Sequence, residues 1–239
     1  MIKQIAIGLL FCSLVTGCSQ QQSNQNANQE PNEWEILFDG ESTDKWRMYN
    51  GGSCPERGWK VEDGMMVFEP VEEDGAEGSQ NIITKKKYKN FHLKLEWQLG
   101  EGSNSGVFYG VLEQLGEQIY WSAPEMQIID NSTFEGREEG NDNRMSGSLY
   151  DLVAAEPQNA NPPGQWNSIQ IIVDGAKVEH WQNGAKVLEV ERWTTEWFEM
   201  IRNSKFECHN EFGNVREGHI GIQDHGGLVK IRNIKIKEL

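Results

Sequence analysis

The segment from residue 91 to residue 99 alternates strictly between apolar and polar side chains. Its apolar positions are Phe91, Leu93, Leu95, Trp97 and Leu99. Because successive side chains of a β-strand point to opposite faces, this alternation predicts a strand with one buried and one solvated face. A helix would need apolar residues at a period of 3.6, which the segment lacks. A chain with such a strand has to bury its apolar face against a second layer.

The remaining pattern predicts many short strands joined by tight turns. Four further apolar runs cover 106–112, 169–173, 177–181 and 186–190. The last three are separated by an Asp-Gly and an Asn-Gly pair, which are typical of hairpin turns. The final apolar segment changes face near Asn233, which predicts a β-bulge, and a helix is expected only over 195–203. We therefore expect an all-β fold, a jelly-roll β-sandwich of two antiparallel sheets.

The first residues are typical of an exported lipoprotein. Lys3 precedes an apolar run over 5–15, which is too short for a membrane-spanning helix of about 20 residues and matches the apolar part of a signal peptide. Small residues then precede Cys18, as in the bacterial lipobox, where a peptidase cuts before a cysteine that carries lipid. We expect a signal peptide over 1–17 and lipidation of Cys18.

The segment 18–33 is rich in Gln, Asn and Ser and has no aromatic or branched apolar side chain, so it is expected to form a flexible tether. The folded, carbohydrate-active domain is expected to cover 34–239, which is about 200 residues and enough for one sandwich core. The predicted location is the cell envelope, with the domain lipid-anchored to the outer membrane on its periplasmic or its surface face.

The net charge of −15 limits the classes of partner. Nucleic acids bind basic faces, so none is expected as a partner of this acidic chain. Membrane contact is expected through the lipid anchor only. A strong net charge suits a solvated domain outside the cytoplasm.

Polar side chains share one face of two predicted strands. Glu125 and Gln127 lie on the face opposite the apolar residues of their segment, and Gln223 and His225 do the same in theirs. On a curved sheet such faces converge into a groove lined by a carboxylate, imidazoles and amides. Those groups, with aromatic rings for stacking, suit a hydroxyl-rich ligand such as a carbohydrate.

The predicted catalytic residues are Glu125, His180 and His225. The residues expected to bind substrate are Asn104, Ser105, Tyr109, Gln127, Tyr150, Asp151, Trp181 and Gln223. Plainer interpretations stand beside these, because a carboxylate on an open sheet face is often only solvated. Asn104 and Ser105 lie beside glycines, as turn residues do. A histidine inside a strand, such as His180, is as often structural as catalytic.

A divalent cation is a further candidate ligand. The sequence contains no His-x-x-x-His, no Cys-x-x-Cys and no acidic calcium loop, and it has no phosphate-binding loop or dinucleotide fingerprint. Glu125, His180 and His225 are of the right types to meet around a metal ion in the folded chain, since spatial clusters leave no local pattern.

Several short strings carry a family resemblance when they are taken together. They are LFDG at 37–40, SNSGVFY at 103–109, EMQIIDN at 125–131, GSLYDL at 147–152, VEHWQNG at 178–184, GIQDHG at 221–226 and RNIK at 232–235. They resemble the 3-keto-disaccharide hydrolase domain family, which is common in Bacteroidetes-type lipoproteins. The resemblance covers essentially all of 34–239.

The resemblance implies a concanavalin-like jelly roll and an enzyme that cleaves glycosidic bonds in 3-keto-glycosides and 3-keto-disaccharides. A ketone at C3 acidifies the C2 proton, so a base can remove it and the aglycone can leave from C1 by elimination, followed by hydration. His180 or Glu125 is the expected base and His225 the expected acid. Asn104, Gln127 or a divalent cation would stabilise the enediolate.

Two other functions stay open at this point. An ordinary glycoside hydrolase would use two carboxylates, Glu125 with a partner such as Asp151 or Glu179. A non-catalytic carbohydrate-binding module at the cell surface would use the same groove and aromatic rings without turnover.

Overall fold

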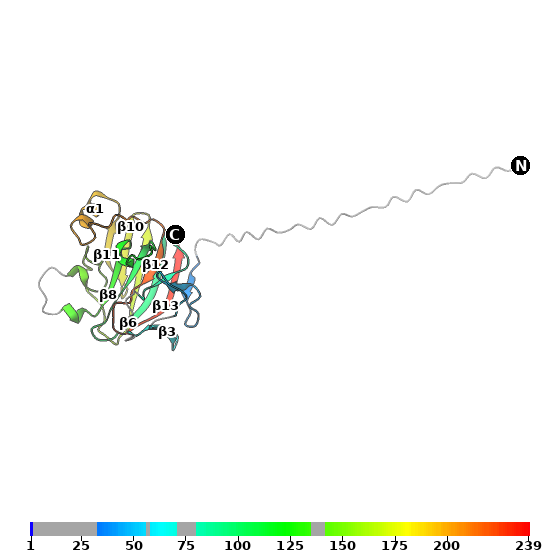
Figure 1. The fold of residues 1–239 in the computed structure, drawn as a ribbon, viewed down its shortest axis with the longest axis horizontal. Coiled ribbons are helices and arrows are strands. Elements are labelled where there is room, and N and C mark those ends of the chain that lie inside the picture. Colours follow the sequence, from blue (N-terminus) through cyan, green and yellow to red (C-terminus); the bar gives the residue numbers. More distant parts are fainter. Residues whose placement is uncertain (2–32, 56–57, 71–79, 135–141) are drawn as a thin grey trace.

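The structure is a computed structural model that describes residues 1, 33–55, 58–70, 80–134 and 142–239. In Figure 1 the strands form the body of the molecule, and α1 lies at the end opposite β3. The strands are β1 (Glu35–Phe38), β2 (Trp46–Met48), β3 (Trp59–Glu62), β4 (Met65–Phe68), β5 (Ile82–Thr84), β6 (Phe91–Leu99), β7 (Asn104–Val111), β8 (Glu125–Ile129), β9 (Asn167–Asp174), β10 (Lys177–Gln182), β11 (Ala185–Glu191), β12 (His219–Ile222) and β13 (Val229–Glu238). The helices are α1 (Thr195–Arg202) and the short 3-10 turns η1 (Ile119–Trp121), η2 (Asn131–Phe134) and η3 (Asp142–Arg144).

These strands form two antiparallel sheets. Sheet A has eight strands in the order β11-β10-β9-β6-β13-β4-β3, with β1 also paired to β13. Sheet B has five strands in the order β2-β5-β12-β7-β8. Most neighbouring strands are far apart in the sequence, as in a jelly roll. The predicted all-β sandwich of two antiparallel sheets is therefore confirmed.

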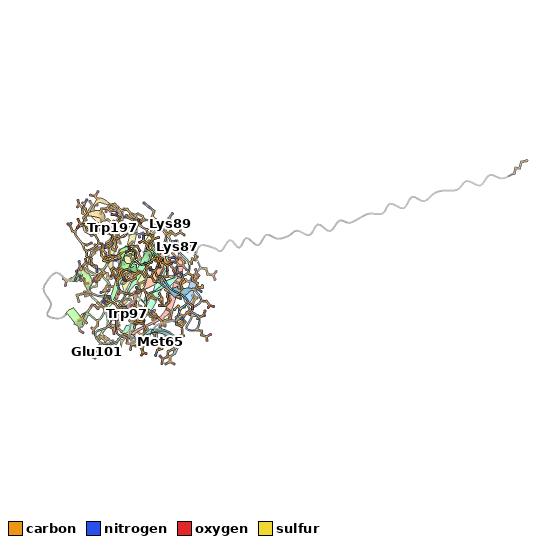
Figure 2. All side chains as sticks on the ribbon, in the orientation of Figure 1. Met65, Lys87, Lys89, Trp97, Glu101 and Trp197 are labelled. Atoms are coloured by element: carbon orange, nitrogen blue, oxygen red, sulfur yellow. The ribbon has the colours of Figure 1, made fainter. Side chains whose placement is uncertain are left out.

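The two sheets pack through their apolar faces. In β6 the odd-numbered residues are buried and the even-numbered ones only half-buried, as the alternation predicts. Inward residues of sheet B, such as Val107, join the same core. Trp97 is buried in this core, whereas Lys87, Lys89 and Glu101 are exposed; all four are labelled in Figure 2. The inner faces thus form the hydrophobic core, and only the outer faces are accessible to a ligand.

Strands β9, β10 and β11 form the predicted meander. The turn between β9 and β10 contains Gly175 with a φ of 58°, and the turn between β10 and β11 contains Asn183 with a φ of 47°. Glycine and asparagine adopt positive φ with little strain, which explains these residues at both hairpins.

Strand β13 changes its pairing partner halfway along its length. Its first residues pair with β4 and its last with β1, and its register against β6 shifts between Arg232 and Lys235. Asn233, in this interval, has a φ of 55°. The predicted bulge is confirmed, and it lets both Ile231 and Ile234 reach the core.

Helix α1 agrees with the predicted segment 195–203 to within one residue. The hydroxyl of Thr194 accepts a hydrogen bond from the N–H of Trp197 at 3.1 Å, which caps the helix. Trp197 and Ile201 are buried against the core. This packing also fixes the turn that follows the helix, which carries Lys205.

A second apolar cluster covers part of the outer face of sheet B. Its members are Tyr49, Ile83, Phe108, Val111, Ile119 and Ala123. The cluster lies over the second half of β7. The first half of that strand instead presents Asn104 and Gly106 on its outer face. The outer face of sheet B is therefore apolar at one end and polar at the other.

The predicted signal peptide, the lipidation site Cys18 and nearly all of the tether lie outside the described residues. Residues 135–141 lie outside the described residues as well. Within the described part of the chain, no helix is long and apolar enough to cross a membrane.

Candidate active site

Strand parity places a row of polar groups on the outer face of sheet B. Met126 and Ile128 of β8 point into the core, so Glu125 and Gln127 point outward. Gly106 of β7 lies opposite Gln127 in the strand register. On its other side, the N–H of Gln223 donates to the carbonyl of Gly106 at 2.9 Å. Gly106 is therefore at the centre of the row.

The carboxyl group of Glu125 lies directly over Gly106. A β-carbon built on Gly106 would be 1.8 Å from Oε1 of Glu125 and 2.6 Å from its Cδ. Atoms do not approach so closely, so position 106 has to be glycine for Glu125 to lie there. The requirement is steric, since Gly106 is not among the residues with positive φ.

Burial raises the pKa of Glu125 to about 8, and the positive charge of Lys205 opposes part of that rise. Only 6% of the surface of Glu125 is exposed, which explains why burial dominates. Its Oε1 atom has no hydrogen-bond partner among the described residues. A carboxyl group in this setting is mostly protonated at neutral pH and is able to donate a proton.

His225 lies in the loop after β12, beside the start of β7. The N–H of Asn104 donates to the carbonyl of Gly226 at 3.3 Å, which joins the two segments. His225 is exposed as a residue, yet partial burial of its ring, helped by the positive charge of Lys205, lowers its pKa. The imidazole is therefore neutral at neutral pH and is able to accept a proton.

Amide side chains lie on the same outer face of sheet B. We call the polar surface around Gly106 the hollow, and its residues are Glu125, Gln127, Asn104, Gln223 and the adjoining His225. Oε1 of Gln223 and Oδ1 of Asn104 are buried and have no hydrogen-bond partner among the described residues. The side-chain N–H of Gln127 donates to the carbonyl of Arg144 at 3.3 Å, which orients that amide. Buried polar atoms without hydrogen-bond partners destabilise the protein until a ligand supplies those partners. Sugar hydroxyl groups supply both donors and acceptors.

Lys205 is a site residue that sequence reasoning missed. Its Nζ lies 4.2 Å from the ring centroid of Tyr150 and 5.7 Å from that of Tyr120. The N–H of Tyr150 donates to the carbonyl of Glu125 at 3.0 Å, so the ring and the carboxyl belong to adjoining backbone. Lys205 also perturbs the pKa of both Glu125 and His225. No local pattern marks this lysine, because its role depends on how the turn after α1 packs.

Aromatic rings continue the rim from Tyr120. The centroids of Tyr120 and Trp121 are 4.5 Å apart, and Trp121 stacks on His209 with centroids 3.7 Å apart. Flat rings of this kind pack against the apolar face of a sugar ring. The expected binding residue Tyr150 is thus part of a larger aromatic rim.

Asp151 lies at the rim but is engaged with protein partners. It forms an ion pair with Arg144, and it accepts a hydrogen bond from the backbone N–H of Lys205 at 3.4 Å. Its observed contacts position Lys205, whereas the sequence predicted a direct contact with substrate.

Asp224 holds the loop that carries His225. Its Oδ2 accepts a hydrogen bond from the N–H of Gln80 at 2.9 Å, and its own N–H donates to Oδ1 of Asn81 at 2.9 Å. Burial raises the pKa of Asp224 to about 6. This pair of bonds ties the end of β12 to the start of β5.

The structure places His180 between the sheets, away from the hollow. It is fully buried, with Nε2 3.2 Å from the hydroxyl oxygen of Tyr109 and Nδ1 3.0 Å from the carbonyl oxygen of Gly147. Burial lowers the pKa of His180 to about 4. The sequence predicted His180 in catalysis and Tyr109 in substrate binding, but the structure encloses both side chains in the core and does not bring them to the hollow.

Ser105 and Trp181 are also away from the hollow, contrary to expectation. The hydroxyl of Ser105 is buried and donates to the carbonyl of Gln223 at 2.8 Å. Trp181 lies on the outer face of sheet A, where its ring N–H donates to Glu179 at 2.8 Å. Ser105 supports the strand end from inside, and Trp181 belongs to the other sheet.

The expected ligands of a divalent cation are not brought together. Glu125 and His225 lie near the hollow, but His180 lies on the core side of the sheet. Within the described ranges, no group of three or more His, Cys, Asp or Glu side chains is placed to hold a metal ion. The described side chains therefore do not fit a divalent cation.

Comparison with known proteins agrees with this fold. Residues 33–237 match the family described as the 3-keto-alpha-glucoside-1,2-lyase-like domain. The chain belongs to this family. A 3-keto-disaccharide hydrolase from Bacteroides thetaiotaomicron is 39% identical over 229 residues, covering 85% of this chain and 77% of that protein. The resemblance seen in the sequence is confirmed, and the chain is a glycoside-cleaving enzyme.

Two solved structures from Parabacteroides distasonis ATCC 8503, both provisionally assigned as glycosyl hydrolases, share the architecture. One is 33% identical with a TM-score of 0.78, covering 86% of this chain and 94% of its own. The other is 25% identical with a TM-score of 0.67, covering 87% of this chain and 100% of its own.

The raised pKa of Glu125 should make stability depend on pH. The folded value of about 8 exceeds the ordinary value of 4.5, so the folded state holds a proton that the unfolded state releases. The free energy of unfolding should therefore fall as pH rises between these two values. Glu125→Gln stays neutral, so its stability relative to the wild type should rise by about 2 to 4 kcal/mol from about pH 5 to about pH 8. Urea unfolding at each pH measures this, and a constant difference would contradict it.

Gly106→Ala should destabilise the fold by about 1 to 3 kcal/mol, because the new methyl group overlaps the carboxyl group of Glu125. In a Glu125→Ala background the same change should cost much less, since the three atoms nearest to that methyl all belong to Glu125. Chemical unfolding of the four proteins completes the cycle. If Gly106→Ala lowered the free energy of unfolding equally in both backgrounds, the new methyl group would overlap atoms other than those of Glu125.

Proposed function

We propose that this enzyme cleaves the glycosidic bond of 3-keto-glycosides, including 3-keto-disaccharides, by elimination followed by hydration. The observation that carries the proposal is the buried carboxyl of Glu125 over Gly106, with His225 at the mouth of the same hollow. The family and its named relatives support this choice of substrate.

The two titratable groups suit opposite tasks at one pH. Glu125 is protonated because burial raises its pKa, and His225 is neutral because its surroundings lower its pKa. Groups whose pKa values are moved in opposite directions are typical acid and base partners. We assign Glu125 as the acid and His225 as the base. This reverses the assignment expected from the sequence, where His225 was the acid.

In the first step, His225 removes the C2 proton, which the adjacent C3 ketone acidifies. The electron pair of the C2–H bond is delocalised onto the C3 oxygen, which gives the enediolate. The same pair then forms the C1=C2 double bond, while the C1–O bond to the aglycone breaks. Glu125 gives its proton to the leaving oxygen. In the second step, water adds across the double bond, with the hydroxyl at C1 and a proton at C2. The net change is hydrolysis.

The enediolate is the species that the rest of the hollow would stabilise. Amide N–H groups of Gln127 and Asn104 are donors on the outer face of β7 and β8, and the ammonium of Lys205 adds positive charge nearby. Donors fixed in place before the reaction stabilise developing negative charge without reorganisation.

Hydrolysis by two carboxylates is less well supported by the geometry. That mechanism needs a second carboxylate about 5 to 9.5 Å from the first. Glu179 lies on the outer face of sheet A, and Asp151 is held by Arg144 and the backbone of Lys205. A non-catalytic carbohydrate-binding module would bind sugar without releasing the aglycone, so the turnover experiment distinguishes it from an enzyme.

The purified chain should release a chromogenic aglycone from a 3-keto-glucoside and not from the unoxidised glucoside. Glu125→Gln and His225→Asn should each lower kcat about 100-fold to 10,000-fold, because each removes one proton-transfer group. Glu62→Gln, which changes an exposed carboxylate on β3, the edge strand of the other sheet, should match the wild type. Activity should decline above about pH 8 as Glu125 ionises, and this decline should be absent in Glu125→Gln.

Performing the reaction in D₂O tests the elimination step separately. The 3-keto-glucose product should carry deuterium at C2, because the C2 proton leaves and a solvent proton returns. Release of the aglycone without deuterium at C2 would show direct hydrolysis. Sugar binding without release from either glucoside would favour a binding module.

We further propose that the chain is anchored in the cell envelope by lipid on Cys18, as the residues before it indicate. An alkyne-bearing fatty acid should label the protein in cells of an expressing bacterium. Labelling should disappear in Cys18→Ala and persist in Cys208→Ala, which removes an exposed cysteine of the domain. Labelling that survives in Cys18→Ala would contradict the anchor.

A further inference from the structure

A cavity lies on the outer face of sheet A, which is the sheet that does not carry Glu125. Its volume is about 610 Å³, and it crosses four neighbouring strands, β1, β13, β6 and β9. Volumes of a few hundred cubic ångströms are typical of small-ligand sites. Neither the catalytic hollow nor the family comparison assigns this cavity a role.

The strand register builds a row of outward side chains across this cavity. Lys235 of β13 lies opposite Lys94 of β6, which lies opposite Gln170 of β9, which in turn lies opposite Trp181 of β10. The residues on either side of Lys94 along β6 are buried in the core, so Lys94 itself points outward. The row therefore combines two ammonium groups, an amide and an indole on one surface.

The two ammonium groups have no ion pair among the described residues. Nζ of Lys94 and Nζ of Lys235 lie 4.9 Å and 5.2 Å from the ring of Trp34, instead of beside a carboxylate. Glu96, also in the cavity, is satisfied by Arg232 at 2.7 Å and by Asn233 at 3.1 Å.

The other acidic group that lines the cavity is likewise engaged. Oδ1 of Asp39 accepts the backbone N–H groups of Glu41 and Ser42, each at 2.9 Å. Asp39 keeps its negative charge, because these bonds lower its pKa. Lys94, Lys235 and the neighbouring Arg232 carry three positive charges against the two negative charges of Asp39 and Glu96, which leaves an excess of one positive charge on a chain whose net charge is −15. Charge complementarity with an anion is the simplest reason for such a local excess.

Half-buried indole rings flank the cationic row. Trp34 lies over the two lysines, and Trp181 is held by Glu179 through its ring N–H. The ring of Trp166 lies 3.8 Å from the guanidinium carbon of Arg232, beside the Glu96 end of the cavity. Aromatic rings with nearby amide and ammonium donors bind sugars, since they match both the apolar face and the polar edges of a pyranose.

We propose that this surface is a second saccharide site, which binds a carboxylate-bearing oligosaccharide such as one built of uronic acids. The two ammonium groups meet the carboxylates of the ligand, and the indoles stack on its rings. The site is separate from the catalytic hollow and holds an acidic glycan while the hollow acts on a substrate. The concave shape favours a discrete ligand over the flat surface of an anionic membrane.

Calorimetry of the full chain with trigalacturonate, and with neutral galactotriose, tests the site. Trigalacturonate should bind, galactotriose should bind more weakly, and affinity should fall as salt is raised. The double variant Lys94→Gln/Lys235→Gln should lose affinity for trigalacturonate about 10-fold to 100-fold, because two charge-assisted contacts are removed. Lys230→Gln, on the same face of β13 but outside the cavity, should bind as the wild type does.

Turnover of the 3-keto-glucoside shows whether the double variant is folded. Its turnover rate should equal that of the wild type, because neither lysine lies near the hollow. Glu125→Gln should keep its affinity for trigalacturonate, which separates this site from the proposed catalysis. Equal affinity of the double variant and the wild type, or no trigalacturonate binding at all, overturns the proposal. The double variant is compared with the wild type on phosphatidylglycerol vesicles as well. Vesicle binding that depends on the same lysines, without binding of trigalacturonate, overturns the saccharide site and indicates a membrane contact.

Discussion

The packing of two sheets face to face is the constraint on which the rest of the molecule depends. Each strand divides its side chains between a shared apolar interior and an outer face, because its period is two. The interior takes the aromatic and branched residues, and even His180 and Tyr109 are enclosed there with their polar atoms paired to one another. Function is therefore confined to the outer faces and to the loops that border them.

On sheet B, the missing side chain of Gly106 creates the space in which Glu125 is buried. That burial outweighs the opposing positive charge of Lys205, and it makes the carboxyl a proton donor at neutral pH. The same hollow holds amide atoms without partners at Gln223 and Asn104, so it is incomplete until a polar ligand enters. Gly106 thus provides the room for the carboxyl group of Glu125, and the burial there raises its pKa. The acid–base chemistry proposed for the enzyme depends on both effects.

The two outer faces differ in the chemical groups that they present. The hollow of sheet B centres on a buried carboxyl group, whereas the cavity of sheet A presents the ammonium groups of Lys94 and Lys235. The bulge at Asn233 contributes to the second surface, because it sets the register that brings Lys235 beside Lys94. One sandwich therefore offers two chemically distinct surfaces without a second domain.

The sequence by itself determined the features that depend on neighbours along the chain. The alternation in β6, the hairpin turns, the bulge at Asn233 and the shared face of Glu125 and Gln127 all follow from local geometry. Only the tertiary structure decided which sheet each face belongs to. His180 looked catalytic because it lies between polar and aromatic residues, yet β10 is in sheet A and its inner face is core. Lys205 left no signal, and the pKa of Glu125 depends on burial by segments distant in sequence, which local patterns do not encode.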